Sequence, residues 1–190
     1  MATERRLDLD QTYTIDEYMR LAESGERYEL VNGRLSPMSP TSADHGDIGG
    51  LLTIYLGHYV LQHGLGRVYA AETAFVLNAD ARDVRAADIA FVTASRVLDI
   101  IGSDPLPFPP DLAVEVVSPS DRLTEVRKKA RVYQRAGIPL VWVVNPRHRT
   151  VQVYHPADLR PITLGPGDQL DGEDVVPGFT LPVRTLFRLP

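Results

Sequence analysis

The fold of this chain is decided by residues 112–117, Leu112-Ala113-Val114-Glu115-Val116-Val117, together with residues 140–144, Leu140-Val141-Trp142-Val143-Val144. Both runs are almost wholly apolar, which is typical of strands buried on both faces of a sheet. The segment between them repeats apolar residues at helical spacing and stops at Gly137, so it predicts a helix. A strand–helix–strand crossover makes its two strands parallel neighbours. We therefore expect an α/β domain with a mixed central β-sheet flanked by helices.

Local signals predict the other elements. Thr14 and Glu17 form the capping box of a helix, and Asn32-Gly33 suits the tight turn of a β-hairpin. In chain order we expect a helix over 14–24, a hairpin over 28–38, a long amphipathic helix over 42–63, strands at 68–71 and 74–77 that continue as a meander, a polar turn over 79–85, an acid-bearing strand over 86–92, a short helix over 94–101 and a strand over 150–154. N-cap residues at 118–121 are expected to start the helix before Gly137.

Two carboxylates interrupt these apolar runs. Asp88 stands in the run 86–92, and Glu115 stands in the run 112–117. An ionised group buried without a partner costs several kcal/mol, so each charge needs compensation. A divalent metal held between two neighbouring strands would use both acids at once. The alternative is that each acid is buried for structural reasons and is satisfied by an arginine or by backbone donors.

Composition narrows the class of protein. The 190 residues are 44% hydrophobic and 24% charged, which fits one soluble domain, 1–190, with an N-terminal extension over 1–13, a core over about 14–155 and turns with short strands over 156–190. There is no cysteine, so a metal would be held by oxygen or imidazole. No apolar stretch approaches the roughly 20 residues of a membrane span, and the first residues lack the pattern of a secretory signal. A cytoplasmic location is expected.

Charge and histidine spacing limit the possible partners. The net charge of −5 argues mildly against binding to nucleic acid, although six basic residues fall within 122–135. Such a run is more often the solvated side of a helix. Histidines 58, 63, 148 and 155 lack the spacing of zinc ligands. No GxSxG, Walker or GxGxxG motif occurs, which leaves serine hydrolases, nucleotide switches and dinucleotide enzymes without support.

The ordered set of motifs resembles a known group of nucleases. The order of elements is similar to that of the PD-(D/E)XK nuclease superfamily, and more closely to that of a bacterial family of restriction-endonuclease-like proteins. The resemblance extends over about residues 14–155 and is carried by Tyr28-Glu29-Leu30-Val31-Asn32-Gly33, Met38-Ser39-Pro40 with His45, Ala87-Asp88-Ile89-Ala90-Phe91-Val92, residues 111–120, Lys129 with Tyr133, Ala136-Gly137-Ile138-Pro139, and Trp142-Val143-Val144-Asn145-Pro146. Each motif alone is weak evidence for this family, but the whole set in this order is specific to it.

The resemblance implies roles for individual residues. Asp88 and Glu115 would be ligands of Mg²⁺, for which Mn²⁺ can substitute, and the backbone carbonyl of Val116 would be a further ligand. Three accessory residues are implied or lie nearby: Glu29 as an acid near the metal, His45 as a contact to substrate phosphate, and Tyr133 on the same helix face as the lysine. The residues alone leave other roles open, since Glu29 fits the solvent face of a hairpin and His45 fits a surface or capping position.

The chain departs from the superfamily pattern in two places. The motif lysine would stand at position 117, where this chain has Val117, and the resemblance assigns the role to Lys129 on the following helix. The proline before the first acid is replaced by Ala87. Pro110-Asp111 is a literal proline–acid pair, but it lies on the Glu115 strand and is interpreted as a decoy.

The expected function is a metal-dependent nuclease that hydrolyses phosphodiester bonds of nucleic acid, with DNA as the favoured substrate. In this hypothesis Lys129 stabilises charge in the transition state. A homodimer is expected by analogy with nucleases that cut both strands of a duplex. The alternative is a nuclease-like fold of weak or no activity that acts in nucleic-acid or protein binding, which the acidic balance and displaced lysine favour. Hydrolysis of another phosphoester also remains open.

Overall fold

A computed structural model describes residues 9–187, except 24, 26, 39–40, 99–104 and 120. The helices are α1 (Ile15–Glu23), α2 (Ala43–Gln62), α3 (Ala94–Val97), α4 (Leu123–Arg135) and a 3₁₀ turn (Val183–Phe187). The strands are β1 (Tyr28–Val31), β2 (Arg34–Pro37), β3 (Gly66–Ala70), β4 (Ala74–Asn78), β5 (Asp83–Ala86), β6 (Ile89–Thr93), β7 (Leu112–Val116), β8 (Leu140–Asn145), β9 (Thr150–Tyr154), β10 (Ile162–Leu164), β11 (Gln169–Asp171) and β12 (Thr180–Pro182). Among the helices described, none is long and apolar enough to cross a membrane.

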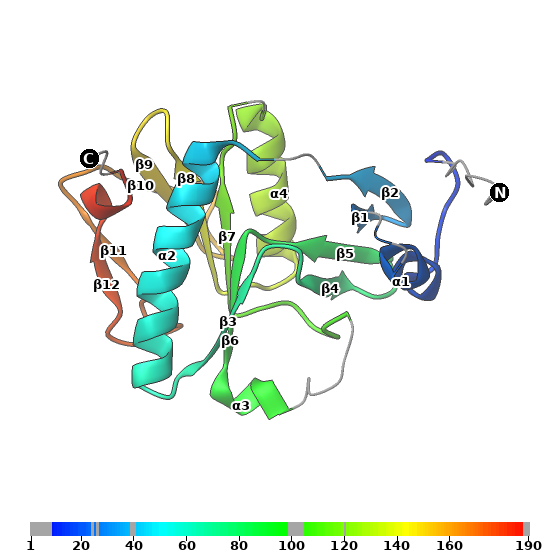
Figure 1. Cartoon of the computed structure of the whole chain (residues 1–190), viewed down its shortest axis with the longest axis horizontal. Helices are drawn as coiled ribbons and strands as arrows, with labels where there is room; N and C mark the ends of the chain where they lie inside the picture. The colour runs from blue at the N-terminus through cyan, green and yellow to red at the C-terminus, as the bar shows by residue number, and fades with distance from the viewer. Residues whose placement is uncertain are drawn as a thin grey trace.

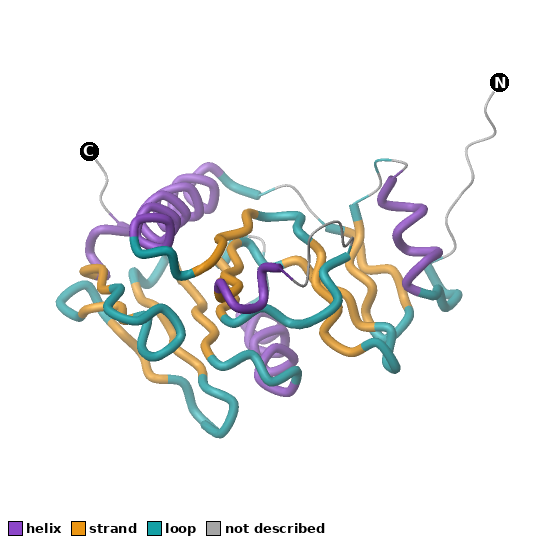
Figure 2. The backbone as a smooth tube through the Cα atoms, turned by 90° about the horizontal axis from the view of Figure 1, so that it is seen from below, coloured by secondary structure: helices purple, strands orange, loops and turns teal. Residues whose placement is uncertain are grey.

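The main sheet has the strand order β10-β9-β8-β7-β6-β3 (Figure 1). β7 and β8 are parallel and are joined through α4, which confirms the predicted crossover. The other neighbouring pairs in this sheet are antiparallel, so the sheet is mixed, as expected. Figure 2 shows α2 and α4 on opposite faces of this sheet. The α/β prediction with flanking helices is confirmed.

Two hydrophobic layers hold the helices against the sheet. On the α2 side, Leu52 and Leu56 pack with Trp142, and on the α4 side Ala130 and Tyr133 belong to a second cluster. Ala113 and Val117 belong to this second cluster. Side chains alternate along a strand, so Glu115, which lies between these two residues in sequence, points toward α4.

A second sheet, in the order β2-β1-β5-β4, lies beside the first and carries α1 (Figure 1). The predicted polar turn over 79–85 is therefore wrong in its second half, because residues from Asp83 onward form β5. The predicted meander is also wrong, since β3 pairs with β6 and β4 pairs with β5. These four strands make one long hairpin that bends from one sheet into the other. The bend falls near Glu72, which has φ 75°, and at 87–88.

Several local predictions are confirmed and one is wrong. In the capping box the Thr14 N–H donates to Glu17 Oε2 at 2.8 Å, and the Glu17 N–H donates back to Thr14 Oγ1 at 3.2 Å. The hairpin turn uses positive φ at both Asn32 and Gly33. The N-cap of α4 is Arg122, without a side-chain cap, and not a residue of 118–121. α3 is described only to Val97 with one further turn residue, and the predicted end at 101 lies outside the described residues.

The C-terminal part of the chain contributes to the core. β11 pairs with β12, and the 3₁₀ turn follows directly. Phe179, Leu181, Val183 and Leu186 are buried in the layer that contains α2. Residues 169–187 therefore complete the packing of α2 against the main sheet.

Candidate functional site

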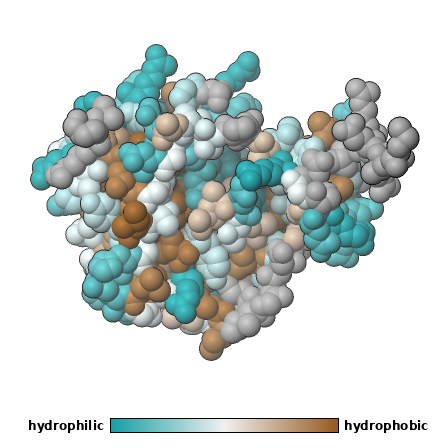
Figure 3. Space-filling model, in the orientation of Figure 1, coloured by the Kyte–Doolittle hydropathy of each residue, from teal (hydrophilic) through white to brown (hydrophobic). Residues whose placement is uncertain are grey.

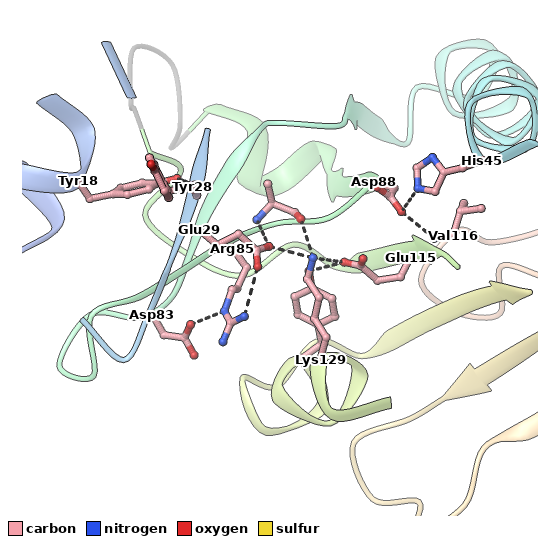
Figure 4. A network of polar contacts seen from close by, with 12 residues as sticks. Tyr18, Tyr28, Glu29, His45, Asp83, Arg85, Asp88, Glu115, Val116 and Lys129 are labelled. Atoms are coloured by element: carbon pink, nitrogen blue, oxygen red, sulfur yellow. Dashed lines mark hydrogen bonds and ion pairs between the residues drawn. The ribbon is translucent and has the colours of Figure 1, made fainter. Parts of the chain in front are cut away.

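The candidate site lies where the two sheets meet (Figure 4). Asp88 occupies the bend between β5 and β6, immediately before the last β6–β7 register pair, Ile89 with Val114. This register places Asp88 beside Glu115 of β7. Asp88 is not inside a strand as the sequence suggested, and its side chain keeps 20% of its exposure, compared with 10% for Glu115.

Asp88 is held by a backbone donor and a histidine. Its Oδ2 accepts a hydrogen bond from the Val116 N–H at 2.7 Å and lies 2.9 Å from His45 Nε2. The hydrogen bond to Asp88 raises the pKa of His45, although burial opposes this change. The buried His45 ring is thus directed at the first acid instead of lying on the surface. Val116 takes part through its N–H, and its proposed role as a carbonyl ligand stays a prediction.

Lys129 bridges two acids. Its Nζ lies 2.9 Å from Glu29 Oε1 and 2.9 Å from Glu115 Oε1, and it donates to the Ala86 carbonyl at 3.1 Å. Although burial opposes it, attraction to the two carboxylates raises the pKa of Lys129. The amine is therefore a cation at neutral pH. This position follows from the crossover, because α4 starts just after β7 and lies against the face to which Glu115 points.

Glu115 is the acid whose ionised form is disfavoured by its surroundings. The Tyr133 hydroxyl donates to its Oε1 at 2.6 Å, and burial also raises the pKa of Tyr133. Burial raises the pKa of Glu115 to about 7, against the attraction of Lys129, and the negative charges of Asp88 and Glu29 add to the rise. One lysine does not fully compensate the carboxylates around it.

Glu29 is buried, so its assignment to the solvent face of the hairpin is wrong. Its Oε1 accepts from the Ala86 N–H at 3.2 Å, and Arg85 Nη1 lies 3.3 Å from its Oε2. Arg85 also donates from Nε to Asp83 Oδ1 at 2.6 Å. Asp83 and Arg85 were not predicted as site residues, because their polarity placed both in a turn. The alternation of Asp83-Val84-Arg85-Ala86 was the available signal for a strand.

Asp111 lies outside this network. Its Oδ2 accepts from the Thr93 N–H at 2.8 Å, and its Oδ1 pairs with Arg96 at 2.6 Å. These contacts tie the entry of β7 to the end of β6. The proline–acid pair at 110–111 thus has a structural role, in agreement with its interpretation as a decoy.

The donor set is compatible with a hard divalent cation that keeps several water ligands. Among the residues the structure describes, no three His, Asp or Glu side chains converge to hold a metal by themselves. Asp88 and Glu115 offer carboxylate oxygens, and Mg²⁺ is commonly bound through one or two carboxylates, with water and substrate phosphate completing its shell. The raised pKa of Glu115 marks uncompensated negative charge at the same place.

The fold is a mixed α/β sheet with flanking helices, and the site brings buried acids together around one lysine. The structure is similar to the crystal structure of a putative nuclease belonging to DUF820 from Anabaena variabilis ATCC 29413, with a TM-score of 0.79, 20% identity, and coverage of 92% of this chain and 97% of that chain. At this identity the likeness shows the fold alone. The model of the Uma2 family, described as "Putative restriction endonuclease", matches residues 15–184, and the chain belongs to this family. No curated protein matches the chain.

Proposed function

We propose that this protein is a metal-dependent nuclease that hydrolyses phosphodiester bonds of DNA. The observation that carries the proposal is the convergence of Asp88, Glu115 and Lys129, which come from a sheet bend, a central strand and a crossover helix. Membership of the restriction-endonuclease-like family supports the reaction class. Buried acids beside a cation are the parts that phosphodiester hydrolysis needs.

Each residue has a defined task in this proposal. Bound at Asp88, Glu115 and the Val116 carbonyl, Mg²⁺ would supply an activated water and neutralise phosphate charge. Lys129 stabilises the charge that develops on the phosphorus oxygens, because it is a fixed cation at neutral pH. Tyr133 orients the Glu115 carboxylate by its hydrogen bond.

Two further side chains position these groups. Glu29 fixes the Lys129 amine from the side opposite Glu115, and Arg85 in turn holds Glu29. His45 holds the Asp88 carboxylate against the Val116 N–H. We therefore assign Glu29 and His45 to positioning of the proposed catalytic residues.

The experiment combines a binding measurement with a cleavage assay. Mn²⁺ should raise the melting temperature of the wild-type protein and have no such effect on Asp88→Asn. Purified protein should nick supercoiled plasmid with Mg²⁺ or Mn²⁺, and Asp88→Asn and Lys129→Met should lose this activity. The exposed acid Asp80 gives a matched control, Asp80→Asn, that should behave as the wild type. Equal cleavage by wild type and Asp88→Asn would refute the proposal.

A second candidate is a nuclease-like module that binds nucleic acid or protein without cleaving. The observation that favours it is that protein groups already bond both acids: Val116 and His45 bond Asp88, and Lys129 and Tyr133 bond Glu115. This candidate predicts no stabilisation by Mn²⁺ and no cleavage, with unchanged binding in Asp88→Asn. The same titration therefore separates the two candidates.

We also propose that two copies pair through the outer face of α2. Ile54 and Leu61 are 66% and 65% exposed there, and Figure 3 shows apolar residues in this region of the surface. Light scattering after gel filtration should give a dimer, Ile54→Glu should give a monomer, and Leu159→Glu, which changes an exposed leucine elsewhere, should stay dimeric. A monomeric wild type would refute this pairing.

A further inference from the structure

A cavity of about 380 Å³ opens at the carboxyl ends of β7 and β8. Its volume falls in the range of roughly 300–1,000 Å³ that is usual for small-molecule sites. Val117 and Ser118 line it, and they directly follow Val116, whose N–H holds Asp88. Asp44, next to His45, lines another side. The cavity is therefore a neighbour of the candidate site and not part of it.

Two buried polar side chains in the cavity wall have groups without protein partners. Ser118 and Asn145 are each 8% exposed. Asn145 Oδ1 accepts from the His148 N–H at 3.1 Å, and within the described part of the chain its amide NH₂ donates no hydrogen bond. The Ser118 hydroxyl likewise has none there, although the Ser118 N–H donates to Asp121. Both groups belong to residues that line the cavity, so they are available to donate hydrogen bonds to a polar ligand there.

The charged and hydrogen-bonding side chains of the cavity lie on different chain segments. Arg147 and His148 are exposed on the turn after β8, and neither forms an ion pair with another described residue. The first turn of α2 brings Asp44 to the cavity, and the partly exposed Leu123 gives an apolar contact. Asp121 adds a second carboxylate to the wall. A ligand that fits this lining has an anionic part at Arg147, hydrogen-bond donors toward the two acids, and an apolar face.

We propose that this cavity binds one nucleotide of the nucleic-acid substrate, adjacent to the phosphate at Asp88 and Glu115. The nucleotide's phosphate pairs with Arg147 and His148, and its base packs on Leu123. Amino groups of bases donate hydrogen bonds and carbonyl or ring nitrogen atoms accept them, which matches the Asp44 carboxylate and the Asn145 amide. Inorganic phosphate would leave much of the cavity and its polar wall unused. The proposal rests on the proposed nuclease function and adds a recognition subsite to it.

The test measures binding without metal or cleavage. The four deoxynucleoside 5′-monophosphates and inorganic phosphate are each titrated into full-length protein in EDTA, with nuclear magnetic resonance shifts as the readout. Mononucleotides should bind at least about tenfold more tightly than phosphate, with shifts at Ser118 and Asn145. Arg147→Gln should weaken binding about tenfold, since a charge-assisted hydrogen bond is lost. Asp44→Asn should change the preference among the four nucleotides.

A matched control removes an equal charge elsewhere. Arg135→Gln lies on the exposed surface at the far end of α4 and should bind as the wild type does. Equal weakening by Arg147→Gln and Arg135→Gln would overturn the proposal, as would equal affinity for phosphate and mononucleotides. Repeating the nucleotide titration with the Asp88→Asn variant separates the subsite proposal from the nuclease proposal. Retained nucleotide binding there supports the subsite even if the wild type cleaves nothing, whereas cleavage by the wild type without nucleotide binding in the cavity refutes the subsite alone.

Discussion

Replacement of Glu115 by glutamine is expected to stabilise the metal-free protein at alkaline pH. The folded structure raises the pKa of this carboxyl to about 7 from an ordinary 4.5, mainly because it is buried. Between these values the unfolded chain has already released the proton that the folded protein still holds. Stability therefore falls as pH rises from 4.5 to 7, and the loss is complete above 7.

The magnitude follows from the same two values. One pKa unit corresponds to about 1.36 kcal/mol, so the ionised side chain costs the folded state about 3 kcal/mol. Glutamine has no charge to lose and keeps an oxygen that can accept from Tyr133. Lys129 retains Glu29 and the Ala86 carbonyl as partners. For a chain of this length, a gain of about 3 kcal/mol corresponds to roughly 6–12 °C in melting temperature.

The assay is thermal and urea unfolding of both proteins in EDTA at pH 4.5 and pH 8. Glu115→Gln should exceed the wild type at pH 8 and match it at pH 4.5. Glu125→Gln is the control, because Glu125 is exposed and forms a surface pair with Lys128, so it should change stability by less than about 1 kcal/mol at either pH. A loss of stability in Glu115→Gln at pH 8 would show that the ionised Glu115 is a net stabilising partner of Lys129, and the reasoning would fail.

Three further outcomes are expected. Arg85→Leu leaves the buried Asp83 carboxylate without its cation and removes one of the two cations at Glu29, so it should cost about 3–5 kcal/mol in urea unfolding; a cost below 1 kcal/mol would contradict the burial of this network. Thr14→Ala removes the capping box of α1 and should cost about 1 kcal/mol by the same measurement. Burial lowers the pKa of His155, but the bonds to Glu173 and Asp158 produce a net rise. The stabilisation is thus full below pH 6.5 and lost as pH rises through the folded value, and His155→Gln should remove this dependence from the melting curve.

Signals that are local in the chain were sufficient to predict most of the framework. Two apolar runs and the helical spacing of the residues between them predict the crossover from β7 through α4 to β8. The hairpin at 28–37 and the cap of α1 also depend on a few adjacent residues. Such elements are predictable because their main stabilising contacts are made within the segment that forms them.

β5 was not predictable in this way, because its stabilising contacts come from distant segments. Asp83 and Arg85 have the polarity of turn residues, and only pairing with β1 and with Glu29 buries them. Pairing of β3 with β6 likewise depends on the bend at Glu72 and not on the order of strands. The local sequence shows that a residue is polar. It does not show which distant residue will pair with that charge and allow it to be buried.

The two acids that interrupt apolar runs turn out to be physically different. Asp88 lies in a bend, where His45 and the Val116 N–H contact its carboxylate. The network as a whole contains four carboxylates, Glu29, Asp83, Asp88 and Glu115, and two permanent cations, Arg85 and Lys129, so negative charge is in excess. That excess falls on Glu115, the carboxyl whose burial already raises its pKa to about 7. A divalent cation bound beside Glu115 and Asp88 would therefore offset the electrostatic cost of the buried Glu115 carboxylate, and this is the physical reason to expect metal binding to stabilise the fold.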